Sequence, residues 1–142
     1  MNCDQKEILA RLKAEHPALC KLIPQVEEAF ALLKSAYDAG GKVMICGNGG
    51  SAADSEHIVG ELMKGFLKKR PIEGAQRAAF DALDGLPAGF ADKLQGALPA
   101  IALPCHTSLT SAYSNDMAAD MIFAQQVFGY GKPGDVLIAL ST

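Results

Sequence analysis

Residues 42–62 read KVMICGNGGSAADSEHIVGEL, and this stretch decides the fold class of the chain. Its first part, residues 42–46, is a short apolar run of the kind found in buried parallel strands. A glycine-rich turn follows over residues 47–51, and the sequence from Ala52 to Phe66 predicts a helix. Strand, turn and helix in this order predict the first half of a β-α-β unit.

Two further apolar runs lie downstream of this unit, at residues 99–104 and 135–140. A helix is predicted between them, from about Asp116 to Phe128, and it ends at the glycines after Phe128. Strands that alternate with helices predict an α/β fold with a parallel sheet covered on both faces. Because the chain stops directly after the third strand, we expect it to be truncated there.

Upstream of the glycine-rich turn, residues 3–38 are predicted to be helical. Pro17 suits the start of a second helix, whereas Pro24 predicts either a kink or a later helix start. The second helix carries an apolar stripe formed by Leu19, Leu22, Ile23, Val26, Ala29, Phe30 and Leu33. This stripe either belongs to the core of the domain or docks on another subunit, and both interpretations remain open.

These patterns divide the chain into an N-terminal helical segment, residues 1–40, and an α/β portion, residues 41–142. Residues 73–98 fit the alternation of strands and helices less well. Residues 75–83 predict a short helix, and glycines and a proline interrupt residues 84–90. We interpret the whole segment as an excursion or a lid-like element.

Composition argues against nucleic acid and membrane partners. The 142 residues hold 13 Lys and Arg against 16 Asp and Glu, so the net charge is −3 and lacks the basic excess of a nucleic acid binder. No apolar run approaches the roughly 18 residues that a membrane helix needs, and the polar N-terminus carries no secretory signal. The four scattered cysteines fit reduced thiols, so we expect a cytoplasmic protein.

The glycine-rich turn has two interpretations. Its backbone N–H groups and the Ser51 hydroxyl would lie at the positive end of a helix, where phosphate binds. The turn matches neither the Walker A pattern nor a dinucleotide fingerprint. The alternative is a tight turn that needs glycine for backbone reasons alone.

The helix predicted after this turn carries ionisable groups beside its apolar face. We predict that its buried arc contains Ile58, Val59, Leu62 and Phe66. Asp54, His57 and Glu61 fall together on the edge of that arc. His57 and Glu61 lie one turn apart, so they could share a metal ion or a proton-transfer task, and a plain helical ion pair is the alternative.

Residues 46–62, CGNGGSAADSEHIVGEL, resemble the signature of sugar isomerase (SIS) domains, and more narrowly of the phosphoheptose isomerases in that family. The segments LPAIAL (98–103), SND (114–116) and GDVLIALST (134–142) agree with this resemblance. It covers about residues 20–72 and 98–142. It implies a three-layer α-β-α SIS fold with a parallel sheet, homotetramer formation, and isomerisation of a sugar phosphate such as sedoheptulose 7-phosphate through an enediol.

The resemblance also implies roles for individual residues. Substrate contacts would come from Asn48, Gly49, Gly50, Ser51, Asn115, Asp116, Ser141 and Thr142. In this set the turn and the last two residues would hold the phosphate, and Asn115 and Asp116 would contact hydroxyl groups. Glu61 would be the catalytic base. His57 would polarise the substrate, and His57 with Glu61 would form part of a metal site, which holds zinc in some members.

The chain departs from the family pattern in two respects. A glutamine and a second histidine from the family's C-terminal half have no counterpart here, so we expect the 142 residues alone to be inactive. The longer segment 73–98 leaves the identity of the sugar open. The alternative function is a non-catalytic SIS module that binds a protein partner, although such a module would have no chemical need for His57 and Glu61.

Three other residues have plain expectations. His106 is expected to lie in a surface loop, although it follows a predicted strand. Cys46 and Cys105 are expected to be core thiols at strand ends.

Overall fold

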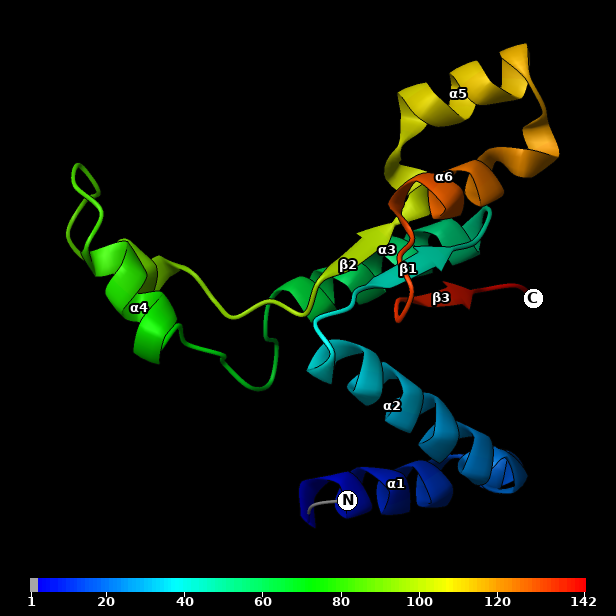
Figure 1. The fold of residues 1–142 in the computed structure, drawn as a ribbon. Coiled ribbons are helices and arrows are strands. Elements are labelled where there is room, and N and C mark those ends of the chain that lie inside the picture. Colours follow the sequence, from blue (N-terminus) through cyan, green and yellow to red (C-terminus); the bar gives the residue numbers. More distant parts are fainter. Residues whose placement is uncertain (1–2) are drawn as a thin grey trace.

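The computed structural model describes residues 3–142, and its centre is a three-stranded parallel sheet (Figure 1). The strands are β1 (Val43–Cys46), β2 (Ala100–Ala102) and β3 (Val136–Ala139). β1 lies in the middle and pairs in parallel with β2 on one side and β3 on the other. The three strands predicted from the apolar runs are therefore confirmed.

β1 is the centre of the core because both of its faces are covered. It is buried along its whole length, as expected for the middle strand of a parallel sheet. α3 (Gly50–Met63) packs against β1 and β2. α6 (Ile122–Tyr130) adds Phe123 and Val127 to the apolar cluster around Met44. The helices thus cover β1 on both faces, as the sequence predicts, whereas one face of β3 is exposed at Leu137 and Ala139.

An ion pair joins the amino ends of β1 and β3. The ammonium group of Lys42 pairs with the carboxylate of Asp135. The backbone N–H groups of Lys42 and Lys132 donate to the same carboxylate at 2.9 and 2.7 Å. The Lys42 side chain, followed by these backbone donors, lowers the pKa of Asp135 from 3.8 to about 2. Charge therefore helps to hold β3 beside β1.

The N-terminal helices form a hairpin that extends away from the sheet (Figure 1). It consists of α1 (Cys3–Glu15), the 3₁₀-helix η1 (Pro17–Leu22) and α2 (Ile23–Asp38). Pro24 lies in the first turn of α2, so the later helix start is confirmed in place of a kink. No helix in the described part of the chain is both long and apolar enough to cross a membrane.

The apolar stripe of the second helix is only partly covered by the rest of this chain. Ile23 is buried, but four of the seven stripe residues are 41–43% exposed: Leu19, Leu22, Val26 and Phe30. The domain's own core therefore accounts for only part of the stripe.

Residues 71–96 form an arm that leaves the sheet beyond the amino ends of the strands (Figure 1). The arm contains α4 (Gly74–Asp81) and the 3₁₀-helix η2 (Ala91–Lys93). An antiparallel bridge between Pro71 and Gln95 closes its base, and the ring centroids of Phe80 and Phe90 lie 5.9 Å apart. The predicted short helix is confirmed. The arm lies at the opposite end of the sheet from the glycine-rich turn (Figure 1).

The helix predicted from Asp116 to Phe128 is wrong in its bounds. The structure has two helices, α5 (Thr107–Asp116) and α6, with the 3₁₀-helix η4 (Ala119–Met121) between them. α5 is rich in Ser and Thr, which are poor helix formers. Two of its hydroxyls donate to carbonyls of its own backbone, from Ser111 to Ser108 and from Ser114 to Thr110. These bonds accommodate the hydroxyl side chains within α5, a helix that the sequence pattern does not predict.

Candidate functional site

The glycine-rich turn connects the carboxyl end of β1 to α3, which begins at Gly50, two residues before the predicted start. Gly49 has a φ of +56°, a left-handed conformation that favours glycine. A Cβ atom on Gly47 would lie 2.6 Å from the Cβ of Ser51. The backbone itself therefore requires glycine at positions 47 and 49.

Gly50 differs from these two glycines. It does not adopt a positive φ, and a Cβ atom there would meet nothing within 4 Å. Within the turn, the backbone N–H groups of Ser51 and Ala52 donate to the carbonyls of Asn48 and Gly49 at 3.1 Å. The turn geometry thus explains two of the three glycines, and it leaves Gly50 available for close approach by a ligand.

The predicted buried face of α3 is only partly correct, because Val59 and Leu62 are half-buried but Ile58 and Phe66 are exposed. Ser55 is the buried residue, at 0% exposure, whereas Ile58 is 36% exposed and Phe66, beyond the end of the helix, is 74% exposed. The Ser55 hydroxyl donates to the Ser51 carbonyl at 2.7 Å, which satisfies its polar atom inside the fold. Because Ser55 is small, α3 can pack closely on the sheet through this side. Ile58 lies at the edge of this side and is partly exposed.

Three of the ionisable residues of α3 lie along an open cavity of about 580 Å³. The cavity is lined by Asp54, His57, Ile58, Glu61, Leu62 and Leu140. Leu140 follows β3, and its backbone N–H donates to the Cys46 carbonyl at 2.8 Å. Helix α3 and the end of β3 thus form one site from segments almost 80 residues apart.

The grouping of Asp54, His57 and Glu61 matches the sequence prediction. His57 Nε2 lies 3.8 Å from Glu61 Oε1. The His57 side chain is 78% exposed and the Glu61 side chain 40%, so the carboxylate is the more sheltered of the two. An imidazole and a carboxylate at this distance can share proton transfer on one bound molecule.

The same pair offers two donors for a metal ion. Structural and catalytic zinc sites take three or four protein ligands. Residues 3–142 contain no group of three His, Cys, Asp or Glu side chains placed to hold a metal ion. The residues present therefore do not make a zinc site by themselves.

The remaining predicted substrate residues divide into two groups. Asn48, Gly49 and Gly50 are exposed in the turn and Ser51 is half-buried, while Ser141 and Thr142 are exposed directly after Leu140. The structure does not bring the other two predicted residues to the cavity. Asn115 and Asp116 end α5, where the Asn115 amide donates to Asp116 at 2.8 Å, and α5 packs on α6 and η4.

The three apolar lining residues, Ile58, Leu62 and Leu140, are not among the sequence-predicted site residues. The sequence pattern places Ile58 in the buried arc, because an apolar residue is expected to face the core. Leu140 follows Ala139, which pairs with Cys46 at the end of β1. The order of strands around the glycine-rich turn is the signal that could have identified Leu140.

Three other expectations are decided by the structure. Cys46 is buried, as predicted, and burial raises the pKa of its thiol. Cys105 is exposed, so its placement in the core is wrong, because it lies in a 3₁₀-turn after β2. Partial burial and the neighbouring Glu56 carboxylate raise the pKa of the Cys105 thiol, which disfavours a reactive thiolate. His106 is half-buried, with Nδ1 3.1 Å from the Tyr130 hydroxyl.

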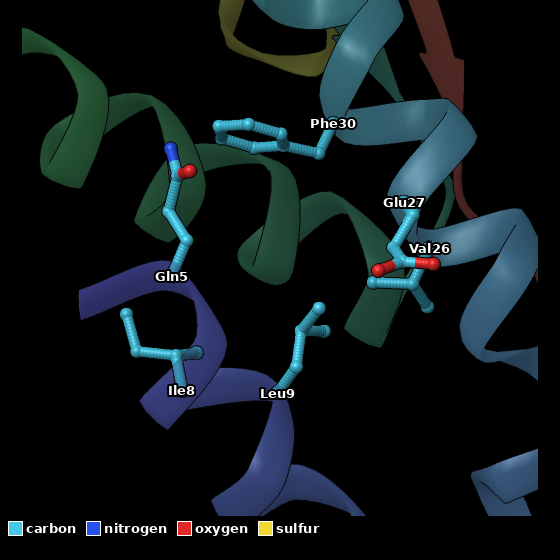
Figure 2. Close-up of a pocket in the computed structure, with 6 residues that line it drawn as sticks. All are labelled: Gln5, Ile8, Leu9, Val26, Glu27 and Phe30. Atoms are coloured by element: carbon cyan, nitrogen blue, oxygen red, sulfur yellow. The ribbon is translucent and has the colours of Figure 1, made fainter. Parts of the chain in front are cut away.

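A second cavity, of about 170 Å³, lies between α1 and α2 (Figure 2). Ile8 and Leu9 from α1 and Val26 and Phe30 from α2 line it, together with Gln5 and Glu27. Its lining is mostly aliphatic and aromatic, and it holds no pair of ionisable groups. This cavity therefore offers no pair of groups for proton transfer, in contrast to the α3 cavity.

Comparison with known proteins gives a consistent family. A family profile described as SIS domain matches residues 10–88. The phosphoheptose isomerase of Rhodospirillum rubrum is 40% identical over 119 residues, which is 84% of this chain and 50% of that protein. The phosphoheptose isomerase of Citrifermentans bemidjiense is 36% identical over 140 residues, which is 96% of this chain and 60% of that protein.

Solved structures agree with the sequence matches. The phosphoheptose isomerase of Neisseria gonorrhoeae superposes with a TM-score of 0.64 at 28% identity, over 97% of this chain and 60% of that chain. A phosphoheptose isomerase from Francisella tularensis, at 23% identity and a TM-score of 0.62, shares the fold. The chain thus spans about half to three fifths of the length of these relatives.

Proposed function

The chain belongs to the SIS domain family. On that premise we propose that it functions in an aldose–ketose isomerase that acts on a sugar phosphate such as sedoheptulose 7-phosphate. The observation that carries this proposal is the arrangement of α3. A phosphate-type turn begins the helix, and His57 and Glu61 line a cavity along the same helix.

In the proposed reaction Glu61 is the base. It removes a proton from the carbon next to the carbonyl of the ketose, while the carbonyl oxygen takes up a proton, and an enediol forms. Glu61 then returns its proton to the neighbouring carbon, and loss of the proton from the other enediol oxygen gives the aldose. His57 would move the protons at the two oxygens, and the distance of 3.8 Å between His57 Nε2 and Glu61 Oε1 supports this role.

The phosphate would be held at the turn. The N–H groups of Gly49 and Gly50 and the Ser51 hydroxyl are the proposed donors, and the missing side chain of Gly50 would allow the phosphate to approach. Ser141 and Thr142 follow Leu140 at the cavity and would contribute further hydroxyls. Binding energy at this remote group would align the reacting carbons.

Three parts of the proposal rest on resemblance alone. Asn115 and Asp116 would contact substrate hydroxyls. The protein would form a cytoplasmic homotetramer. If zinc takes part, His57 and Glu61 would supply two of its ligands, and the ion would polarise the carbonyl.

A non-catalytic SIS module that binds a protein partner is the second candidate. The partly exposed apolar stripe along η1 and α2 favours it, because an apolar surface of this kind fits a protein interface. An isomerase, however, needs both His57 and Glu61, and a binding module needs neither.

The experiment is a turnover assay by NMR with ketose phosphates of five to seven carbons. The 142-residue polypeptide is assayed beside the full product of its gene. Formation of the aldose phosphate from at least one substrate supports the isomerase. Tight binding of sugar phosphate without conversion in either protein favours the non-catalytic module.

A further inference from the structure

We propose that Asp54 is a further substrate-binding residue, whose carboxylate accepts hydrogen bonds from the hydroxyl groups of the sugar phosphate between its phosphate and its reacting carbons. This inference rests on the proposed function, and it assigns the part of the site that would bind the hydroxyl groups of the sugar chain.

The first argument is the position of Asp54 along α3. A helix rises about 1.5 Å per residue, so Asp54 lies about 4.5 Å along the axis from Ser51 and the same distance from His57. Residues three and four apart share a helix face, and Asp54, His57 and Glu61 do line one cavity. If the phosphate of a substrate lies at the turn and its reacting carbons lie at Glu61, the carbons that connect them lie beside Asp54.

The second argument is that the Asp54 carboxylate has no structural task. Ion pairs within the described residues engage five other aspartates of the chain: Asp4, Asp38, Asp81, Asp92 and Asp135. No hydrogen bond or ion pair found among residues 3–142 uses Asp54. Its exposed carboxylate keeps both oxygens free on the cavity side of α3.

The third argument is chemical. An ionised carboxylate only accepts hydrogen bonds, and its two oxygens can accept from two neighbouring hydroxyl groups. Such charge-assisted bonds are stronger than those between neutral groups. The same charge repels a phosphate, so it favours the orientation in which the phosphate lies at the turn and the hydroxyl chain lies at Asp54.

The test measures dissociation constants by calorimetry for two probes, sedoheptulose 7-phosphate and inorganic phosphate. In Asp54→Ala we expect the constant for the sugar phosphate to rise about 10- to 100-fold, the usual effect of losing hydrogen bonds to a charged group. The constant for inorganic phosphate should stay the same or fall. Asp54→Asn should retain part of the sugar-phosphate affinity, because an amide oxygen still accepts.

Glu56→Ala is the matched control, since Glu56 is an exposed carboxylate on the same helix but lies beside Cys105, outside the cavity lining. It should change neither constant. Equal affinity of wild type and Asp54→Ala for the sugar phosphate would overturn the inference, as would an equal loss in Glu56→Ala. If the full product of the gene binds ketose phosphates of five to seven carbons but converts none of them, the proposed isomerase is refuted. The Asp54 comparison is then still decided by the binding constants.

Discussion

The unit from β1 through the glycine-rich turn to α3, residues 43–63, and the arm, residues 71–96, are held in contrasting ways. The first is fixed from inside: β1 is buried throughout, Ser55 is fully buried, and a Cβ atom on Gly47 would meet the Ser51 side chain. The arm is held by a short bridge at its base, one ring pair and exposed ion pairs around Arg77. The difference indicates that the β1–α3 unit, and not the arm, can hold chemical groups in a defined geometry.

In the β1–α3 unit, ionisable side chains stand on a helix that the core keeps in place. Substitutions there should separate into two classes, those that change function and those that change stability. In the arm, exposed pairs contribute little to stability, so substitutions should change neither the site nor the fold strongly. The effects expected from this contrast decrease from the catalytic base, through the turn and the sheet, to the arm.

The largest effect is expected for Glu61→Gln in a protein with turnover. The amide keeps the shape of the side chain but cannot accept the proton, so the rate should fall about 10²–10⁴-fold or more. Binding of sugar phosphate and the melting temperature should stay close to wild type, because Glu61 is partly exposed. Rate assays, calorimetry and thermal melting together check this, and a loss of binding with a preserved rate would assign Glu61 to substrate positioning instead.

The three glycines of the turn should separate stability from binding. Gly47→Ala should destabilise the fold by about 1–3 kcal/mol through the clash with Ser51, and Gly49→Ala by about 1–2 kcal/mol through its positive φ. Gly50→Ala should keep the stability and weaken phosphate binding. Chemical denaturation and phosphate titration measure the two effects, and unchanged phosphate affinity in Gly50→Ala would contradict the proposed anion site.

Low pH should loosen the sheet through Asp135. Its pKa in the folded protein is about 2, below the ordinary value of 3.8, so its stabilising contribution is complete above about pH 4 and is lost as the pH falls toward 2. Asp135→Asn should lower the stability at neutral pH and flatten the change between pH 4 and 2. Denaturation curves across this range check it; equal slopes for both proteins would show that Asp135 does not contribute.

The smallest effect is expected in the arm. Arg77→Ala removes both ion pairs of Arg77, with Asp81 and Asp92, yet exposed ion pairs contribute little to stability. Hydrogen exchange should rise within residues 74–93 while the β1–α3 unit and ligand binding stay unchanged. Faster exchange in α3 as well would show that the two regions are coupled.

The contrast between the two regions also explains which features the sequence predicts. The three strands and the turn follow from continuous apolar runs and from glycine, and the structure confirms them. The pairing of His57 with Glu61 follows from their spacing on one helix, and it too is present. These features depend on local pattern, so one sequence suffices to find them.

The errors arise where tertiary packing outweighs local pattern. Ser55 takes the buried place on α3 that its apolar neighbours are expected to fill, because a small hydroxyl bonded to Ser51 allows close packing. α5 is missed for a different, local reason, because its many Ser and Thr residues lower the helix propensity of the segment. Leu140 joins the cavity only through the pairing of β3 with β1. None of these depends on periodicity along a single element.

The central claim is that Glu61 moves a proton between neighbouring carbons of a bound sugar phosphate. Its most direct test is to incubate sedoheptulose 7-phosphate with the full product of the gene in D₂O and follow the proton signals next to the carbonyl by NMR. The account predicts that the wild-type protein introduces deuterium at this carbon and that Glu61→Gln does not, while both bind the sugar phosphate. Exchange at an equal rate in Glu61→Gln would contradict the claim.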